Sequence, residues 1–276
     1  MLVTNAKEVL MKAKAGKYAV PSCNFIDLDS ARVFCETAEK NRLPLILSFA
    51  EVHQTMISLE EAALVGKYLS GKYDAPIILH LDHGMEPEYC MRAMELGFTY
   101  VMIDASMMDF DGNVRVTKGV VQEAHRRGVQ VEAEIGHVGS NAAESDNSLY
   151  TQPEEAARFV ALSGCDSLAV SIGTSHGVYK TGTPKLNFEV LHGIADALPE
   201  TPLVLHGGSG TGDDNLARCA KEGISKINIC TDFYVAALDA ARAPETADYF
   251  AAKEDTNAAI RKVQEHYYKV FGTKTL

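Results

Sequence analysis

The sequence predicts an α/β protein folded as a single-domain (β/α)8 barrel, and three observations support this fold class. Apolar runs of strand length alternate along the chain with stretches whose apolar residues recur at helical spacing. Eight such strand-and-helix pairs can be counted. The length of 276 residues suits one large barrel domain. A doubly wound open sheet is the alternative, because alternation alone does not decide whether the sheet closes.

The expected strands are short, mostly apolar runs bounded by Gly or polar residues, as in buried parallel sheets. In chain order they span 18–25, 43–50, 76–82, 99–104, 129–135, 166–172, 202–206 and 226–229. The clearest helical spacing between them lies in 29–40, 86–96 and 152–164. Pro153 suits a first helical position, and Gly97 and Gly164 suit helix ends. We expect one domain over 1–276, with a helical extension from about residue 241.

The composition narrows the class of protein. The chain has 26 Lys and Arg against 37 Asp and Glu, a net charge of −11, which argues against nucleic acid or an anionic membrane as partner. Its apolar stretches fall short of the roughly 20 residues that a membrane span needs. The N-terminus shows no signal peptide, and the six cysteines form no CxxC pair. We therefore expect a cytoplasmic protein with reduced cysteines that holds any phosphate by local features.

Polar side chains stand at the expected C-terminal ends of all eight strands. They are Asn24, Glu51, Asp82 with His83, Asp104, Glu134, His176, His206 and Asn228. In a parallel barrel these ends form one face, and barrel enzymes carry their active sites there. A barrel with only a structural role would not need a polar group at every end. The pattern therefore predicts an enzyme.

Three of these residues, His83, His176 and His206, each close an apolar run. A single histidine in that position is more often a hydrogen-bonded core residue than a ligand. Three in the same setting indicate a Zn²⁺ site with a fourth position open for substrate. His80, inside its strand, is expected to be structural.

Asp82, beside His83, is expected to act as proton donor or acceptor, with a helix cap near Glu86 as the alternative. The glycine-rich turn 207–212 follows the seventh strand, where barrels commonly hold phosphate. Asn228 and Thr231 would add donors to the same anion. Lys180 would add charge there or simply be a solvated lysine.

Glu132 and Glu134 share one face of the fifth strand, because they are two residues apart. With Asp104 they would bind a second metal or hydrogen-bond to a metal ligand. The polar segment 139–147 is interpreted either as a mobile lid, with Glu144 reaching the substrate, or as surface loop.

These motifs together resemble one family. His80-Leu-Asp82-His83-Gly84, the segment 169–180, His206-Gly-Gly-Ser209-Gly210 and Lys226-Ile-Asn228-Ile-Cys-Thr231-Asp232 are similar to the class II, zinc-dependent ketose-bisphosphate aldolases. That group includes fructose-1,6-bisphosphate and tagatose-1,6-bisphosphate aldolases. The similarity runs from about residue 4 to the C-terminus, and it implies a (β/α)8 TIM barrel.

The resemblance also implies site roles. Zn²⁺ would lie on His83, His176 and His206, Asp82 would exchange a proton with the C4 hydroxyl, and Asp104 with Glu134 would hold a second or alternative metal. The dihydroxyacetone-phosphate half would be bound near a monovalent cation, Na⁺ or K⁺. The residues expected on the substrate or its phosphate are Asn24, Gly177, Lys180, Gly207, Gly208, Ser209, Asn228, Ile229, Cys230 and Thr231.

The expected reaction is reversible retro-aldol cleavage of a fructose- or tagatose-type ketose 1,6-bisphosphate to dihydroxyacetone phosphate and an aldehyde phosphate. Asp82 takes the C4 hydroxyl proton, the C3–C4 bond breaks, and Glu144 reprotonates the zinc-stabilised enediolate. A Schiff-base route is not expected, because Lys226 is predicted at the very start of its strand, at the wrong face of the barrel.

Three departures from the family keep alternatives open. Ala50 stands where the family has Ser or Thr, so a hydroxyl is missing unless Ser48 or His53 replaces it. Cys230 stands where Asp, Asn or Ala is expected, and the segment 140–147 is short. The first alternative is an enzyme for another ketose phosphate, such as a deoxy-ketogluconate phosphate or a ketose 1-phosphate. The second is a non-catalytic sugar-phosphate-binding barrel, and the presence of Asp82 argues against it.

The family implies a homodimer or homotetramer, with 251–271 able to dock on a neighbour.

Overall fold

The strands close into a barrel. The computed structural model describes residues 1–136, 150–177, 179, 182–242 and 248–276. Its parallel strands pair in sequence order, and the first pairs with the last. They are β1 (Val20–Asn24), β2 (Leu45–Ala50), β3 (Ile77–Gly84), β4 (Tyr100–Ile103), β5 (Gln130–Ile135), β6 (Ser167–Val170), β7 (Leu203–Leu205) and β8 (Ile224–Ile229). The closed order confirms the predicted fold class and excludes the open sheet.

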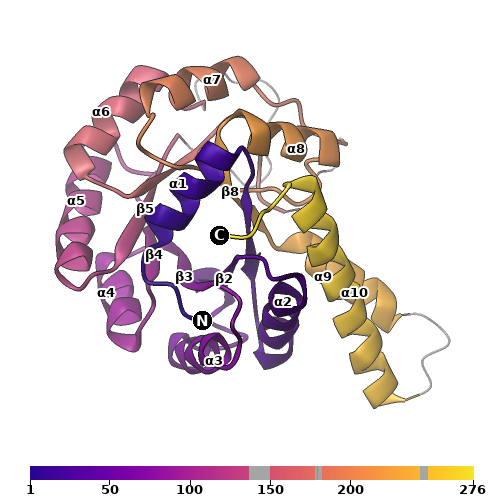
Figure 1. The fold of residues 1–276 in the computed structure, drawn as a ribbon. Coiled ribbons are helices and arrows are strands. Elements are labelled where there is room, and N and C mark those ends of the chain that lie inside the picture. The colour runs from indigo at the N-terminus through magenta and orange to yellow at the C-terminus, as the bar shows by residue number, and fades with distance from the viewer. Residues whose placement is uncertain (137–149, 178, 180–181, 243–247) are drawn as a thin grey trace.

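Helices surround this barrel (Figure 1). They are α1 (Ala6–Gly16), α2 (Leu28–Asn41), α3 (Leu59–Lys72), α4 (Pro87–Leu96), α5 (Phe110–Arg126), α6 (Pro153–Ser163), α7 (Phe188–Ala197), α8 (Asp213–Glu222), α9 (Thr231–Ala241) and α10 (Tyr249–Val270), with a short 3-10 turn η1 (Glu51–His53). The predicted end signals are confirmed: Pro153 begins α6, and Gly97 and Gly164 end α4 and α6 with φ of 101° and 76°.

The helix α1 lies across the N-terminal end of the barrel (Figure 1). Its buried face, which includes Val9 and Leu10, packs on the interior side chains Ile46, Ile78 and Tyr100. This apolar plug seals one end of the barrel. The site predicted at the strand ends therefore lies at the opposite, C-terminal face.

The middle of the barrel interior is polar. Ser22 and Ser48 are 2.6 Å apart between hydroxyl oxygens, and the Ser48 hydroxyl is 3.0 Å from Nδ1 of His80. Glu132 and Lys226 are fully buried at the same level. His80 is hydrogen-bonded in the core, in line with the structural role expected for it.

Lys226 was placed wrongly by the sequence. It lies inside β8, which begins at Ile224, and its ammonium is 2.8 Å from both carboxylate oxygens of Glu132. The interior polar residues Ser225, Lys226 and Asn228 break up the apolar run that would have marked the strand.

Two further findings bear on the composition. No helix among the described residues is long and apolar enough to cross a membrane. All six cysteines are free thiols, and five of them are buried.

Candidate active site

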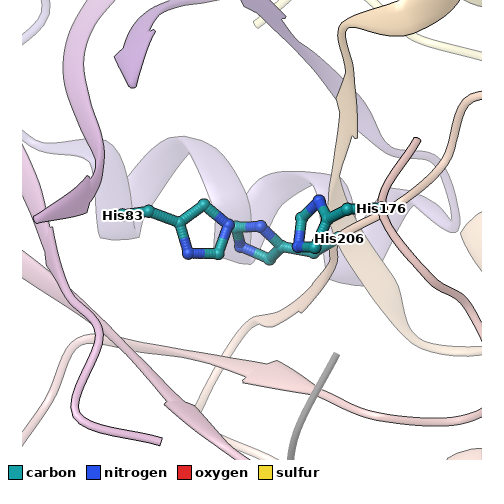
Figure 2. Close-up of side chains that lie close together, drawn as sticks. All are labelled: His83, His176 and His206. Atoms are coloured by element: carbon teal, nitrogen blue, oxygen red, sulfur yellow. The ribbon is translucent and has the colours of Figure 1, made fainter. Parts of the chain in front are cut away.

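The three predicted ligand histidines come together at the C-terminal face. His83 lies near the end of β3, His176 in the loop after β6 and His206 directly after β7. The ring centroids are 4.9, 4.5 and 5.8 Å apart, and one nitrogen from each ring lies within 4.8 Å of the others. Figure 2 shows the rings turned toward one another.

A bulge in β3 explains how Asp82 and His83 serve the same site although neighbours on a strand point to opposite faces. Leu81 and Gly84 pair with Val101 and Ile103, so β3 carries one extra residue there. His83 has φ of 48°, a left-handed conformation that non-glycine residues rarely adopt. Such local strain is typical of functional sites.

Carboxylates orient two of the three imidazoles. Nδ1 of His83 donates to Asp104 at 2.7 Å, and Nε2 of His206 donates to Glu132 at 2.8 Å. The remaining ligand atoms are Nε2 of His83 and Nδ1 of His206, and Nε2 of His83 is buried without a hydrogen-bond partner in the described part of the chain. Three convergent imidazoles with carboxylate support are a donor set that fits Zn²⁺.

The surroundings set the charge of each ring. Burial, followed by the neighbouring rings of His206 and His83, lowers the pKa of His176 to about 3. Burial also lowers the pKa of His206. For His83, burial lowers the pKa, but Asp82 and Asp104 outweigh it and raise the pKa to about 9. Two rings are therefore neutral at pH 7, and the third is held beside two carboxylates.

Asp82 is buried and held from both sides. Its Oδ2 accepts from the Asn24 amide at 2.7 Å and its Oδ1 from the Asn228 amide at 2.9 Å. Burial raises the pKa of Asp82, but the positive charge available on His83 and His206 outweighs it and holds the pKa well below its usual range. The helix cap is instead Glu86, so Asp82 is a fixed carboxylate beside the histidines.

The loops after β6 and β7 are joined beside these histidines. The hydroxyl of Tyr179 accepts from the Ser175 N–H at 2.8 Å and donates to the Gly207 carbonyl at 3.2 Å. Gly207 has φ of 67°, and a Cβ there would lie 2.5 Å from the Ser175 carbonyl oxygen. Only glycine fits this position, so the backbone of the glycine-rich turn approaches the site closely.

The same turn meets the N-terminus of α9. The Ser209 hydroxyl accepts from the backbone N–H of Cys230 at 3.2 Å and of Asp232 at 3.3 Å. Glycine-rich backbone at a helix N-terminus favours an anion. This part of the site has the chemistry of a phosphate cradle.

Comparisons with known proteins agree with this geometry. The family "Fructose-bisphosphate aldolase class-II" matches residues 4–275. The chain belongs to this family of aldolases.

Three relatives illustrate the range of the family. The D-tagatose-1,6-bisphosphate aldolase subunit GatY of Klebsiella oxytoca is 36% identical over 273 residues, covering 98% of this chain and 92% of the relative. The fructose-bisphosphate aldolase of Geobacillus stearothermophilus is 38% identical over 251 residues, covering 88% and 85%. The crystal structure of the YdjI aldolase from Escherichia coli K12 superposes with a TM-score of 0.90 at 34% identity, covering 99% of this chain and 98% of that one.

Glu132 links the three histidines of this aldolase to the barrel interior. Besides His206 it binds the ammonium of Lys226 and the hydroxyl of Tyr100, all fully buried. Burial raises the pKa of Glu132, but Lys226 and His206 outweigh it and lower the pKa overall. The sequence suggested only one of these roles, a hydrogen bond to a ligand, and gave no sign of the ion pair.

The ammonium of Lys226 is bound by Glu132, which argues against a role as a Schiff-base lysine. The sequence argued against that role from the position of Lys226 in its strand.

The second-metal residues also converge. Asp104, Glu134 and His83 each offer a ligand atom within 4.8 Å of the others. Asp104 uses its other oxygen to accept from the N–H and hydroxyl of Ser106. The three residues could therefore bind a second ion together. Alternatively, the carboxylate of Asp104 only holds the ring of His83 in place.

The predicted substrate residues divide into three groups. Those around the turn and α9 are Gly207, Gly208, Ser209, Asn228, Ile229, Cys230 and Thr231, and Gly177 follows His176. The side chain of Ile229 is fully buried, so only its backbone is available, and the Gly208 N–H donates to the Asn228 carbonyl. Asn24 contacts Asp82, away from the turn. Lys180 and Glu144 lie outside the described residues.

Proposed function

We propose that this aldolase catalyses Zn²⁺-dependent, reversible retro-aldol cleavage of a ketose phosphate to dihydroxyacetone phosphate and an aldehyde. The observation that carries the proposal is the buried Asp82 carboxylate held directly beside three convergent histidines. Its intact environment also argues against a non-catalytic sugar-phosphate-binding barrel.

The metal would lie on His83, His176 and His206, where a bound zinc ion supplies Lewis acidity beside the substrate carbonyl. A second ion on Asp104 and Glu134, and a monovalent cation near the glycine-rich turn, remain predictions of the same kind. The neutral forms of His176 and His206 are the forms that bind metal.

The residues of the chain divide the remaining work. Asp82 accepts the proton of the C4 hydroxyl while Asn24 and Asn228 hold its oxygens in place, and the C3–C4 bond then breaks. The turn at 207–212 and the N-terminus of α9 hold the phosphate on C1. Glu144 is proposed to return a proton to C3 of the dihydroxyacetone-phosphate half.

Fructose 1,6-bisphosphate and tagatose 1,6-bisphosphate are the first substrates to test, because they are named in the family and in the relatives above. Another ketose phosphate, either a deoxy-ketogluconate phosphate or a ketose 1-phosphate, is the second candidate. It is supported by Ala50, which presents a methyl group opposite Asp82 in the β2–β3 register.

The test is cleavage of a ketose phosphate panel with dihydroxyacetone phosphate trapped enzymatically. Activity should disappear with EDTA and return with Zn²⁺. A parallel assay follows exchange of a C3 proton of dihydroxyacetone phosphate with solvent deuterium, which needs no aldehyde. Zinc-loaded protein that neither exchanges this proton nor cleaves any member of the panel would refute the proposal.

We also propose a cytoplasmic homodimer or homotetramer. The α9–α10 pair extends beyond the barrel (Figure 1) and exposes Leu238, Tyr249 and Phe250. An apolar group of this kind on an extended element is typical of a subunit contact. Light scattering on the native chain and on Phe250→Glu would test it, and an unchanged mass in the variant would count against this surface.

A further inference from the structure

The site of this aldolase has two sides, with Asp82 between them. The metal-ligand histidines follow β3, β6 and β7, and the glycine-rich turn lies between β7 and α8. In the proposed mechanism the phosphate on C1 would lie in the arc from β6 to β8, and the metal would lie between that arc and β3. Because Asp82 acts at C4, the part of the substrate beyond the C3–C4 bond would lie along β1 to β3, where Asn24 of β1 and Ala50 of β2 border Asp82. We call the two arcs the phosphate side and the aldehyde side.

The aldehyde side is acidic. The segments that follow β1, β2 and β3, residues 24–30, 50–61 and 84–88, contain seven Asp and Glu and no Lys or Arg. These acids are Asp27, Asp29, Glu51, Glu60, Glu61, Glu86 and Glu88. By contrast, the segments after β6, β7 and β8, residues 171–187, 206–214 and 230–232, contain two lysines and three acids. A second phosphate on the aldehyde half would thus enter a negatively charged region and be repelled.

Several of these carboxylates are held in place by the backbone. Asp27 accepts from the Ser30 N–H as the cap of α2, and Glu51 accepts from the Met85 N–H at 2.8 Å. Glu61 accepts from the Ser58 N–H, and that hydrogen bond lowers the pKa of its carboxyl. A carboxylate that accepts from a backbone N–H in this way keeps its orientation and does not turn away from an incoming anion.

Nearby cations offset only part of this charge. Arg32 of α2 and Lys253 of α10 both pair with Asp29, and Arg92 of α4 pairs with Glu60. The segments outside the described residues add none on this side, because 137–149 and 243–247 contain no Lys or Arg in the sequence.

A cavity of about 310 Å³ lies on this side between the β1–α2 loop and α3. Its lining is apolar, including Leu28, Met56 and Leu64, with two carboxylates, Asp27 and Glu61. It contains no basic side chain, so it has no counter-ion for a phosphate.

Two side chains were considered as replacements for the hydroxyl that is missing at Ala50, Ser48 and His53, and the structure leaves His53. Ser48 is excluded, because it is fully buried and its hydroxyl contacts Ser22 and His80. His53 lies in η1, which packs against the end of β3, and its Nδ1 is buried with no hydrogen-bond partner in the described ranges. Burial lowers the pKa of His53, although Asp82 opposes this, so the ring is a neutral donor and acceptor. A neutral imidazole matches a sugar hydroxyl.

We propose that the aldehyde half of the substrate carries no phosphate: the enzyme cleaves a ketose 1-phosphate whose far end is an uncharged polyhydroxy chain, with a hydroxyl on His53. This inference rests on the proposed function and decides between its two candidate substrates. The phosphate side supplies the donors for one anion, and the acidic aldehyde side selects against a second.

The test runs the reaction in the direction of synthesis. Dihydroxyacetone phosphate is offered with D-glyceraldehyde and, separately, with D-glyceraldehyde 3-phosphate. We expect kcat/KM for the uncharged aldehyde to be higher by about tenfold or more, the effect of one repelled anion. Equal values, or a preference for the phosphorylated aldehyde, with deuterium exchange into dihydroxyacetone phosphate intact, would overturn this inference alone. Loss of the exchange itself would overturn the proposed function.

Two variants and one matched control test which residues set this preference between the two aldehydes. Met56→Lys adds a cation to the cavity on the aldehyde side and should improve relative use of the phosphorylated aldehyde by on the order of threefold to tenfold. Met107→Lys, an exposed methionine after β4, is the matched control and should leave the ratio unchanged. His53→Ala should weaken use of D-glyceraldehyde but not of propionaldehyde, which lacks hydroxyls. An equal loss with both aldehydes would refute the contact with His53.

Discussion

The phosphate side and the aldehyde side of this barrel present different chemical groups to the substrate. The phosphate side uses backbone N–H groups, Ser209 and glycines such as Gly207, whose φ of 67° lets the main chain approach the ligand. The aldehyde side presents carboxylates, an alanine and a neutral histidine. An acidic chain with net charge −11 can therefore hold one phosphate through local geometry while its side-chain charge disfavours another.

Asp82 joins the two sides, and its replacement should have the largest effect. Asp82→Asn keeps the shape but removes the base for the C4 hydroxyl, so we expect cleavage to fall by about 10²- to 10⁴-fold. Exchange of the C3 proton of dihydroxyacetone phosphate does not involve that hydroxyl and should fall much less. Steady-state cleavage and deuterium exchange, measured with zinc content, separate the two. A parallel loss of both would place Asp82 in metal binding instead.

Glu132 supports the proposed zinc site from inside the barrel. Its substitution should therefore weaken zinc binding, on which the phosphate side and the aldehyde side both depend. Glu132→Gln keeps a partner for His206 but loses the charge that faces Lys226, and we expect zinc affinity to fall about 10- to 100-fold. The visible spectrum of the Co²⁺-loaded protein should shift as the His206 ligand is reoriented. Glu155→Gln, on the surface of α6, is the control. Unchanged affinity and spectrum would reduce Glu132 to a purely structural residue.

Gly207 tests the phosphate side alone. In Gly207→Ala the new Cβ meets the Ser175 carbonyl oxygen at 2.5 Å, so the turn must move. We expect KM for dihydroxyacetone phosphate to rise about tenfold, which corresponds to the loss of about one hydrogen bond to a charged group. Gly128→Ala has the same positive φ with no neighbour within 4 Å, and it separates backbone strain from the clash. A similar KM change in both variants would contradict a specific role for the turn.

The polar strand ends were predictable because a parallel barrel brings them to one face. The apolar runs predicted the eight strands, and this rule then placed the three histidines and Asp82 at the C-terminal face. The bulge that turns His83 into the site was not predictable, because strand periodicity places neighbours on opposite faces. The Glu132–Lys226 pair was missed for a different reason. A charged residue in a short strand ordinarily faces solvent, and Lys226 was therefore placed at the start of its strand instead of inside it. The contacts of Ser48, which exclude it as a substitute at Ala50, depend on three strands at once.

The smallest expected effect concerns protons at the metal, which both sides share. In the metal-free protein His83 has a pKa near 9, so it is protonated at pH 7.5, whereas His176, with a pKa near 3, is neutral. Because a ligand nitrogen must be free of its proton, zinc binding at pH 7.5 should release about one proton. The release should fall to about half near pH 9, the pKa of His83, and disappear well above that pH. Calorimetry of zinc binding in two buffers with different ionisation enthalpies measures it directly, and release of two or more protons at pH 7.5 would show that Asp82 and Asp104 do not single out His83 among the three rings.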